Sequence, residues 1–153
     1  MSYKKINIPG VHIKWDGYIF PLYQKNVSGP RVSQRRINKL KHLTKRILNE
    51  EKDRIEAEFK QFARQRHRGK QLTVVLDWEA ALSRVDNTFV CHDESLYGES
   101  DGEKIWISKE KMSDAYLLGT LLHEALHYSC LLNGKFICEK DEHQVFRRLG
   151  DDC

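Results

Sequence analysis

One stretch of the chain, residues 113–128, reads SDAYLLGTLLHEALHY. Ser113 and Asp114 are typical of a helix start, because a serine side chain can accept from free backbone N–H groups and an acid in the first turn favours the helix dipole. The leucines and alanine that follow predict a largely buried helix. Asn133-Gly134 marks the place where we expect this helix to stop.

The polar residues inside this apolar helix predict a metal site. His123 and His127 are one helical turn apart, so both rings project from one face and can bind one Zn²⁺ ion about 2.0–2.1 Å away. Glu124 points to the side, where a carboxylate can take a proton from an attacking water and later deliver it to a leaving amine. Burying two unpaired imidazoles would be costly, which favours metal binding over a solvent-facing helix that holds these residues by chance.

A third ligand is expected downstream, because catalytic zinc usually has three protein ligands and one open position. The candidates are Glu139, Glu142 and His143. A final short helix is predicted over residues 140–149, and its apolar side chains place Glu142 at the centre of the core face, whereas His143 is rotated by about 100°. We favour Glu142 and keep His143 as the alternative. A buried Glu142 paired with a base such as Arg148 is the purely structural interpretation.

The HEALH motif at residues 123–127, with Thr120 three residues before it and uncharged neighbours, resembles the motif of the zincin metallopeptidases. Ser129 departs from that pattern, in which an apolar residue is usual. The predicted elements over roughly residues 33–150 are similar to the minimal core of the SprT-like, ImmA/IrrE-like and small gluzincin groups. The resemblance implies an α+β zincin-like fold with a Zn²⁺ cofactor, and hydrolysis of peptide bonds in a protein or peptide substrate. Gluzincin-like groups have an acidic third ligand, and SprT-like members have a histidine.

The remaining sequence predicts that residues 1–153 form one α+β domain. Proline and glycine in residues 1–32 indicate an irregular segment, and the core is expected at about 33–150. Ser33 is expected to cap a long amphipathic helix, either continuous or interrupted, that ends near His67, with Gly69 in the cap that follows.

Short strands of a small mixed sheet are predicted at residues 72–76, 88–91 and 104–108. A loop over residues 92–103 is predicted between the second and the third strand. We place the strand at residues 104–108 at a sheet edge. In zincins such an edge strand binds an extended peptide, and the resemblance implies the same here. His92 and Tyr97 in the loop are given no role.

The charge is distributed unevenly. Residues 31–70 hold 14 Lys and Arg against 5 Asp and Glu, and the rest of the chain holds 12 against 17. Such a basic segment could neutralise phosphates, and SprT-like peptidases act on DNA-bound proteins, so nucleic acid is a candidate partner. The alternative is that these side chains only cover the solvent face of a helix. The basic residues in question are Arg35, Arg36, Lys39, Lys41, Lys45 and Arg46.

The rival function is therefore a nucleic-acid-associated binding protein whose HExxH site is structural or idle. For location, no run of about 18 apolar residues and no apolar core of a signal peptide is visible, so we expect an intracellular protein without a membrane partner. The four cysteines form no C-x-x-C pair and are expected to be free thiols.

Overall fold

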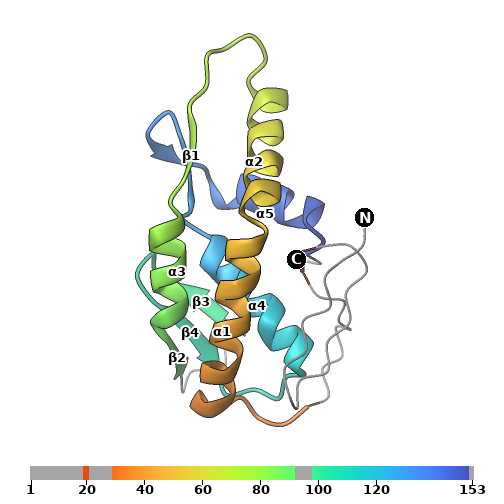
Figure 1. The fold of residues 1–153 in the computed structure, drawn as a ribbon, viewed down its shortest axis with the longest axis vertical. Helices are drawn as coiled ribbons and strands as arrows, with labels where there is room; N and C mark the ends of the chain where they lie inside the picture. The colour runs from red at the N-terminus through yellow and green to blue at the C-terminus, as the bar shows by residue number, and fades with distance from the viewer. Residues whose placement is uncertain (1–18, 21–28, 92–97, 152–153) are drawn as a thin grey trace.

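The computed structural model describes residues 19–20, 29–91 and 98–151, which form a mixed α+β structure (Figure 1). Most of the expected irregular segment at residues 1–32, together with His92 and Tyr97, lies outside the described residues. The elements are α1 (Gln34–Glu50), α2 (Lys52–Arg66), β1 (Val74–Leu76), α3 (Trp78–Asp86), β2 (Thr88–Cys91), β3 (Gly98–Ser100), β4 (Ile105–Ser108), α4 (Asp114–Leu126), β5 (Cys130–Leu132), β6 (Lys135–Phe136) and α5 (Glu139–Arg148).

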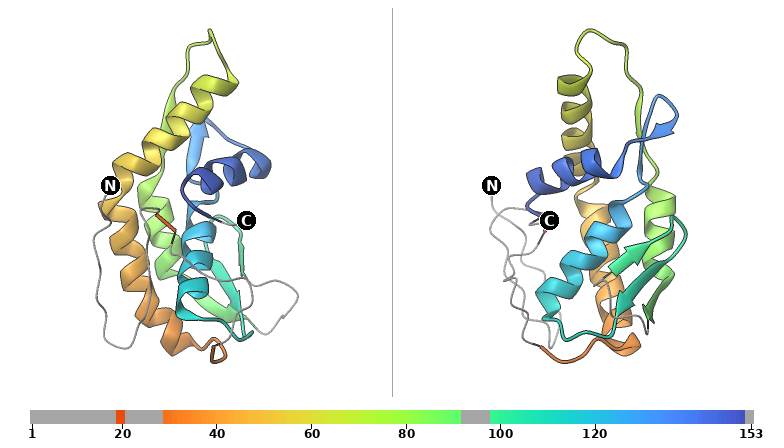
Figure 2. Two further views of the ribbon diagram at one scale, coloured as in Figure 1. Left: turned by 90° about the vertical axis from the view of Figure 1, so that its right-hand side faces the viewer. Right: turned by 180° about the vertical axis from the view of Figure 1, so that it is seen from behind.

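The long N-terminal helix of the prediction forms two consecutive helices, α1 and α2. Ser33 caps α1 as expected, because its Oγ accepts from the backbone N–H of Arg36 at 3.3 Å. Glu51 interrupts the helix with a ψ of 15°, and α2 begins at the next residue. Gly69, with a left-handed φ of 78°, follows the end of α2. The two helices run one after the other along the long axis of the molecule (Figure 2).

The first sheet has the strand order β2-β4-β3, with β4 parallel to β2 and antiparallel to β3. The prediction that residues 104–108 form an edge strand is therefore wrong, because β4 lies in the middle. Part of the segment predicted as a loop forms β3, in which Glu99 pairs with Trp106. Glycine and glutamate have low strand propensity, and β3 is held by its pairing with β4. The edge strand beside α4 is β3.

The second sheet has the order β1-β5-β6 and is antiparallel throughout. Asn133 and Gly134, which we expected to stop the helix that begins after Ser113, instead turn the β5–β6 hairpin with φ angles of 50° and 82°. Two consecutive positive φ angles suit the tight turns that join hairpin strands, and Asn-Gly is the favoured pair for them. That helix, α4, ends earlier, at Leu126.

The helix α3 was not predicted, although Asp77 caps it by accepting from the N–H of Ala80 at 3.1 Å. It packs with α1 and α4, while α5 packs on α2. The apolar faces of these helices form one core, with α4 inside it. Within the described ranges, no helix is both long and apolar enough to cross a bilayer.

Candidate metal centre

The metal motif lies at the C-terminal end of α4. His123 is in the last turn of the helix and His127 is the residue that caps it. The Nε2 atoms of the two rings are 3.0 Å apart. The one-turn spacing in the sequence therefore brings two imidazole nitrogens to a common point.

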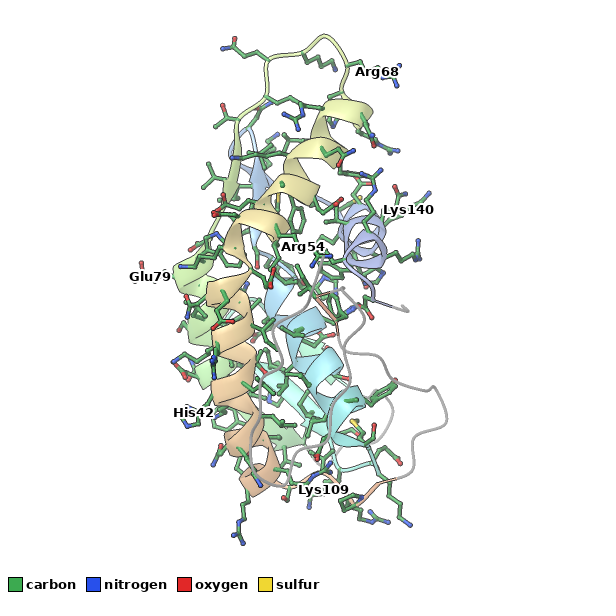
Figure 3. All side chains as sticks on the ribbon, turned by 45° about the vertical axis from the view of Figure 1, so that its right-hand side comes forward. His42, Arg54, Arg68, Glu79, Lys109 and Lys140 are labelled. Carbon is green, nitrogen blue, oxygen red and sulfur yellow. The ribbon has the colours of Figure 1, made fainter. Side chains whose placement is uncertain are left out.

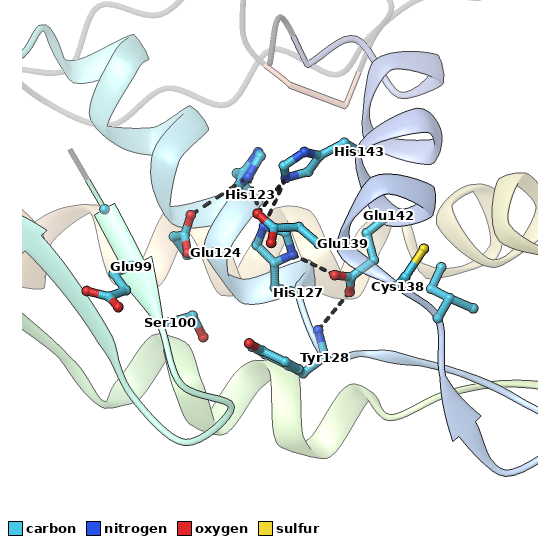
Figure 4. Close-up of a pocket in the computed structure, with 12 residues that line it drawn as sticks. Glu99, Ser100, His123, Glu124, His127, Tyr128, Cys138, Glu139, Glu142 and His143 are labelled. Atoms are coloured by element: carbon cyan, nitrogen blue, oxygen red, sulfur yellow. Dashed lines mark hydrogen bonds and ion pairs between the residues drawn. The ribbon is translucent and has the colours of Figure 1, made fainter. Parts of the chain in front are cut away.

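His143, on α5, completes a cluster of three imidazoles. Its Nε2 lies 3.3 Å from Nε2 of His127, and one nitrogen from each of the three rings lies within 4.8 Å of the others. Tetrahedral zinc with Zn–N bonds of about 2.05 Å places its ligand nitrogens about 3.3 Å apart, so this donor set fits the ion in type and spacing. The three rings converge from two helices (Figure 4).

Glu142, the third ligand that we favoured, lies outside this cluster. Its side chain faces inward as the helical phase predicted, with 3% of the residue exposed. However, Oε1 is 2.7 Å from Nδ1 of His127, on the other side of the ring from Nε2, and Oε2 accepts from the N–H of Tyr128 at 2.8 Å. The geometry thus favours the alternative, His143. Arg148 is not the partner of Glu142, since it donates to Gln65 at 2.7 Å.

Helical phase did not predict the cluster of three imidazoles, because Glu142 on the core face of α5 contacts the backbone at the end of α4. The cluster forms at Nε2 of His127, whereas Glu142 lies at Nδ1 of the same ring. His143, next to the core face of α5, therefore approaches Nε2 of His127, whereas Glu142, at the centre of that face, approaches Nδ1. The sequence showed which side chain is buried but not which buried point the metal would occupy.

Asp151 supports the other histidine of α4 and was not predicted. Its Oδ2 lies 2.5 Å from Nδ1 of His123, and the Asp151 residue is 7% exposed. Gly150, with a φ of 103°, turns the chain back after α5 so that this carboxylate can reach the ring. A carboxylate on Nδ1 holds a ligand ring in place and fixes its tautomer. No local sequence signal marks such a residue.

Burial and neighbouring charges shift the pKa values of three groups at the centre. Burial raises the pKa of its carboxyl group, and the nearby His123 and His127 only partly oppose this. At His127, burial alone would lower the pKa, but the hydrogen bond and charge of Glu142 outweigh it and leave the pKa raised. At His143, burial and the two neighbouring imidazoles lower the pKa.

A cleft of about 600 Å³ opens onto the cluster. Gly98, Glu99 and Ser100 of β3 line one wall, and the first turn of α5 lines another (Figure 4). Glu139, also a candidate ligand, is at this second wall with Oε1 3.8 Å from Nε2 of His143. The wall formed by β3 was missed because those residues were predicted to be a loop.

A buried arginine connects the end of α4 to the turn between β3 and β4. Arg84 on α3 is 2% exposed and donates to the carbonyl of Gly102 at 3.0 Å and to the carbonyl of Ala125 at 2.9 Å. It also donates to Oγ of Ser129 at 2.9 Å, and Ser129 in turn donates to Ala125. Ser129, which departs from the zincin pattern, is thus a hydrogen-bond partner of a buried arginine. Its polarity at a position that is usually apolar was the one sequence signal for such a partner.

No protein-family model, curated protein or solved structure matches this chain. The resemblance to zincins rests on the motif and stays a prediction.

Proposed function

We propose that this protein is a zinc-dependent metallopeptidase in which His123, His127 and His143 bind the ion. The observation that carries the proposal is the convergence of three imidazole nitrogens at a cleft, with the Glu124 carboxylate beside the cluster and not among its ligands. When bound, zinc would polarise the scissile carbonyl and make hydroxide available near neutral pH.

Glu124 is the proposed general base and acid. Its Oε2 lies 3.8 Å from Nε2 of His123, and the residue lines the cleft beside the cluster. Burial raises its pKa, which brings the group nearer to the working pH and suits both acceptance and release of a proton. Because β3 is the edge strand at the cleft, we propose that an extended peptide binds along Gly98–Ser100, in place of the strand at residues 104–108.

Glu124→Gln tests the enzyme directly. We expect the variant to bind about one zinc per chain, measured by elemental analysis, and to lose peptide hydrolysis, since the amide cannot take up the proton. Glu79→Gln, an exposed change on α3, is the matched control and should keep both properties (Figure 3). Unchanged hydrolysis by Glu124→Gln, or folded protein that takes up no zinc, would exclude the proposed mechanism.

A second candidate function is nucleic-acid binding. The distribution of exposed bases favours the end of α2 over α1 as the binding surface. Arg36 is engaged, because it donates to the carbonyl of Met112 and to Asp114 at 2.8 and 2.9 Å. The end of α2 and the loop after it carry exposed bases, with no acidic residue between Glu58 and Asp77. Arg68 lies at this far end of the molecule (Figure 3). The exposed bases of this basic tip are Arg64, Arg66, Arg68 and Lys70.

The basic tip predicts a salt-dependent affinity for a labelled DNA duplex. Reversing Arg64, Arg68 and Lys70 to glutamate should abolish binding at low salt, while zinc content stays the same. Reversing Arg35 and Lys39 on α1, which are also exposed, is the comparison and should have a smaller effect. If the unmodified protein binds DNA with an affinity independent of salt, or does not bind it at low salt, nucleic acid is excluded as a partner.

A further inference from the structure

An apolar stripe crosses one face of the β1-β5-β6 sheet. Val75 on β1 pairs with Leu131 on β5, and Leu131 pairs with Phe136 on β6. Directly opposed residues of neighbouring strands place their side chains on the same face. Val75 is 49% exposed and Phe136 is 53% exposed. We call Val75, Leu131, Phe136 and Tyr128 the apolar stripe.

The opposite face of this sheet packs against the hydrophobic core. Leu76 and Cys130, which also pair with each other, are buried, and Val74 packs against the core. Because side chains alternate along a strand, the stripe must face away from that core. Four large hydrophobic residues are exposed in the described ranges, and three of them, Val75, Tyr128 and Phe136, belong to the stripe.

Tyr128 connects the stripe to the cleft. Its ring stands edge-on to Phe136, with centroids 6.1 Å apart, and the same residue lines the cleft beside His127. Its φ of 58° is a left-handed conformation that a bulky residue seldom adopts, and the bond from its N–H to Glu142 helps to hold it. The chain tolerates this backbone cost at the residue whose ring, 42% exposed, joins the two surfaces.

We propose that the apolar stripe is a docking surface for the substrate polypeptide. It binds large aliphatic or aromatic side chains that lie a few residues from the bond to be cleaved. Three strands span roughly 10 Å, which about three residues of extended peptide can cover, with alternate side chains on the sheet. Tyr128 belongs to both the stripe and the cleft, so a polypeptide bound in the cleft can continue onto the stripe. For this reason we assign the stripe to substrate and not to another occupant. The assignment to substrate rests on the proposed peptidase function.

The test measures peptide binding to the zinc-loaded Glu124→Gln variant by fluorescence anisotropy. The probes are two short labelled peptides, one alternating leucine with serine and one with serine at every leucine position. We expect the leucine peptide to bind and the serine peptide not to bind. Val75→Ser and Phe136→Ser should each weaken binding by about tenfold, as truncation of an interface anchor does. Both side chains are exposed, so zinc content should not change.

Phe89→Ser is the matched control, since Phe89 is 44% exposed but lies on β2 of the other sheet. It should leave peptide affinity unchanged. The His143→Ala variant, without zinc, should still bind the leucine peptide, so docking is measured apart from the metal. Bound peptide that the unmodified chain never cleaves would overturn the peptidase function and not the surface. Equal binding by Phe136→Ser and Phe89→Ser overturns the docking surface, as does a dimer that only Phe136→Ser disrupts.

Discussion

At the residue scale, the two histidines of α4 each have a carboxylate on Nδ1, Asp151 for His123 and Glu142 for His127. Both carboxylates come from α5 and the turn after it. With Nδ1 engaged, Nε2 is left for the cluster, so the rings are oriented before any ion binds. Each buried carboxyl group thus supports one ring of the cluster from its Nδ1 side.

Separate substitutions distinguish ligands from supporting groups. His143→Ala should abolish tight zinc binding, whereas Glu142→Gln and Asp151→Asn should weaken it by about 10- to 100-fold, as loss of a supporting carboxylate does. Competition with a chromophoric chelator measures each affinity. If Glu142→Gln strips the metal and His143→Ala keeps it, Glu142 is the ligand, as helical phase first suggested.

Arg84 should matter for stability because its guanidinium satisfies acceptors at the end of α4. Arg84→Met keeps most of the side-chain volume but strips the hydrogen bonds to Gly102, Ala125 and Ser129. We expect a loss of about 3 kcal/mol in the free energy of unfolding, measured with urea. Arg46→Met, which breaks only an exposed pair with Glu50, should cost about 0.5 kcal/mol or less. Equal losses would show that Arg84 contributes no special support.

At the element scale, local pattern predicted the elements that carry their own signals. The caps at Ser33 and Ser113 and the apolar periodicity located α1 and α4, and the short final helix was placed within one residue. The strand β3 and the early end of α4 involve tertiary contacts, namely pairing with β4 and the hydrogen bond that the Tyr128 N–H donates to Glu142. Local propensity contains no information about either contact.

Gly98 allows β3 to approach α4 closely. A Cβ at this position would lie 2.6 Å from Cγ2 of Thr120, so Gly98→Ala should displace the strand and cost about 1–3 kcal/mol of unfolding free energy. Thr120→Ser removes Cγ2 but keeps the hydroxyl that donates to Tyr116. The double variant should recover most of the loss in urea unfolding. A double variant as unstable as Gly98→Ala would place the clash elsewhere.

At the scale of the whole molecule, the candidate centre forms where α4, α5 and β3 meet. The sequence could bring His123 and His127 together because they lie one turn apart at the end of one helix. It could not place Asp151, Glu99 or Arg84, since each reaches the centre through a different tertiary contact. His143 was only an alternative for the same reason, because its ring is placed by how α5 packs and not by its own helix.

The pairing of β1 with β5 has a consequence for the order of events in folding. Val74 pairs with Leu132, and the carbonyl of Ser129, two residues after His127, accepts from the N–H of Asp77 at 2.8 Å. Contacts between segments so distant along the chain close slowly. We expect the three imidazoles to converge only after the rate-limiting step. Zinc should then leave the refolding rate in stopped-flow measurements unchanged and slow unfolding, because a ligand absent from the transition state stabilises only the native side of the barrier. Faster refolding with zinc would mean that the histidines meet early. In the expected case, the ion prolongs the lifetime of a fold that it takes no part in nucleating.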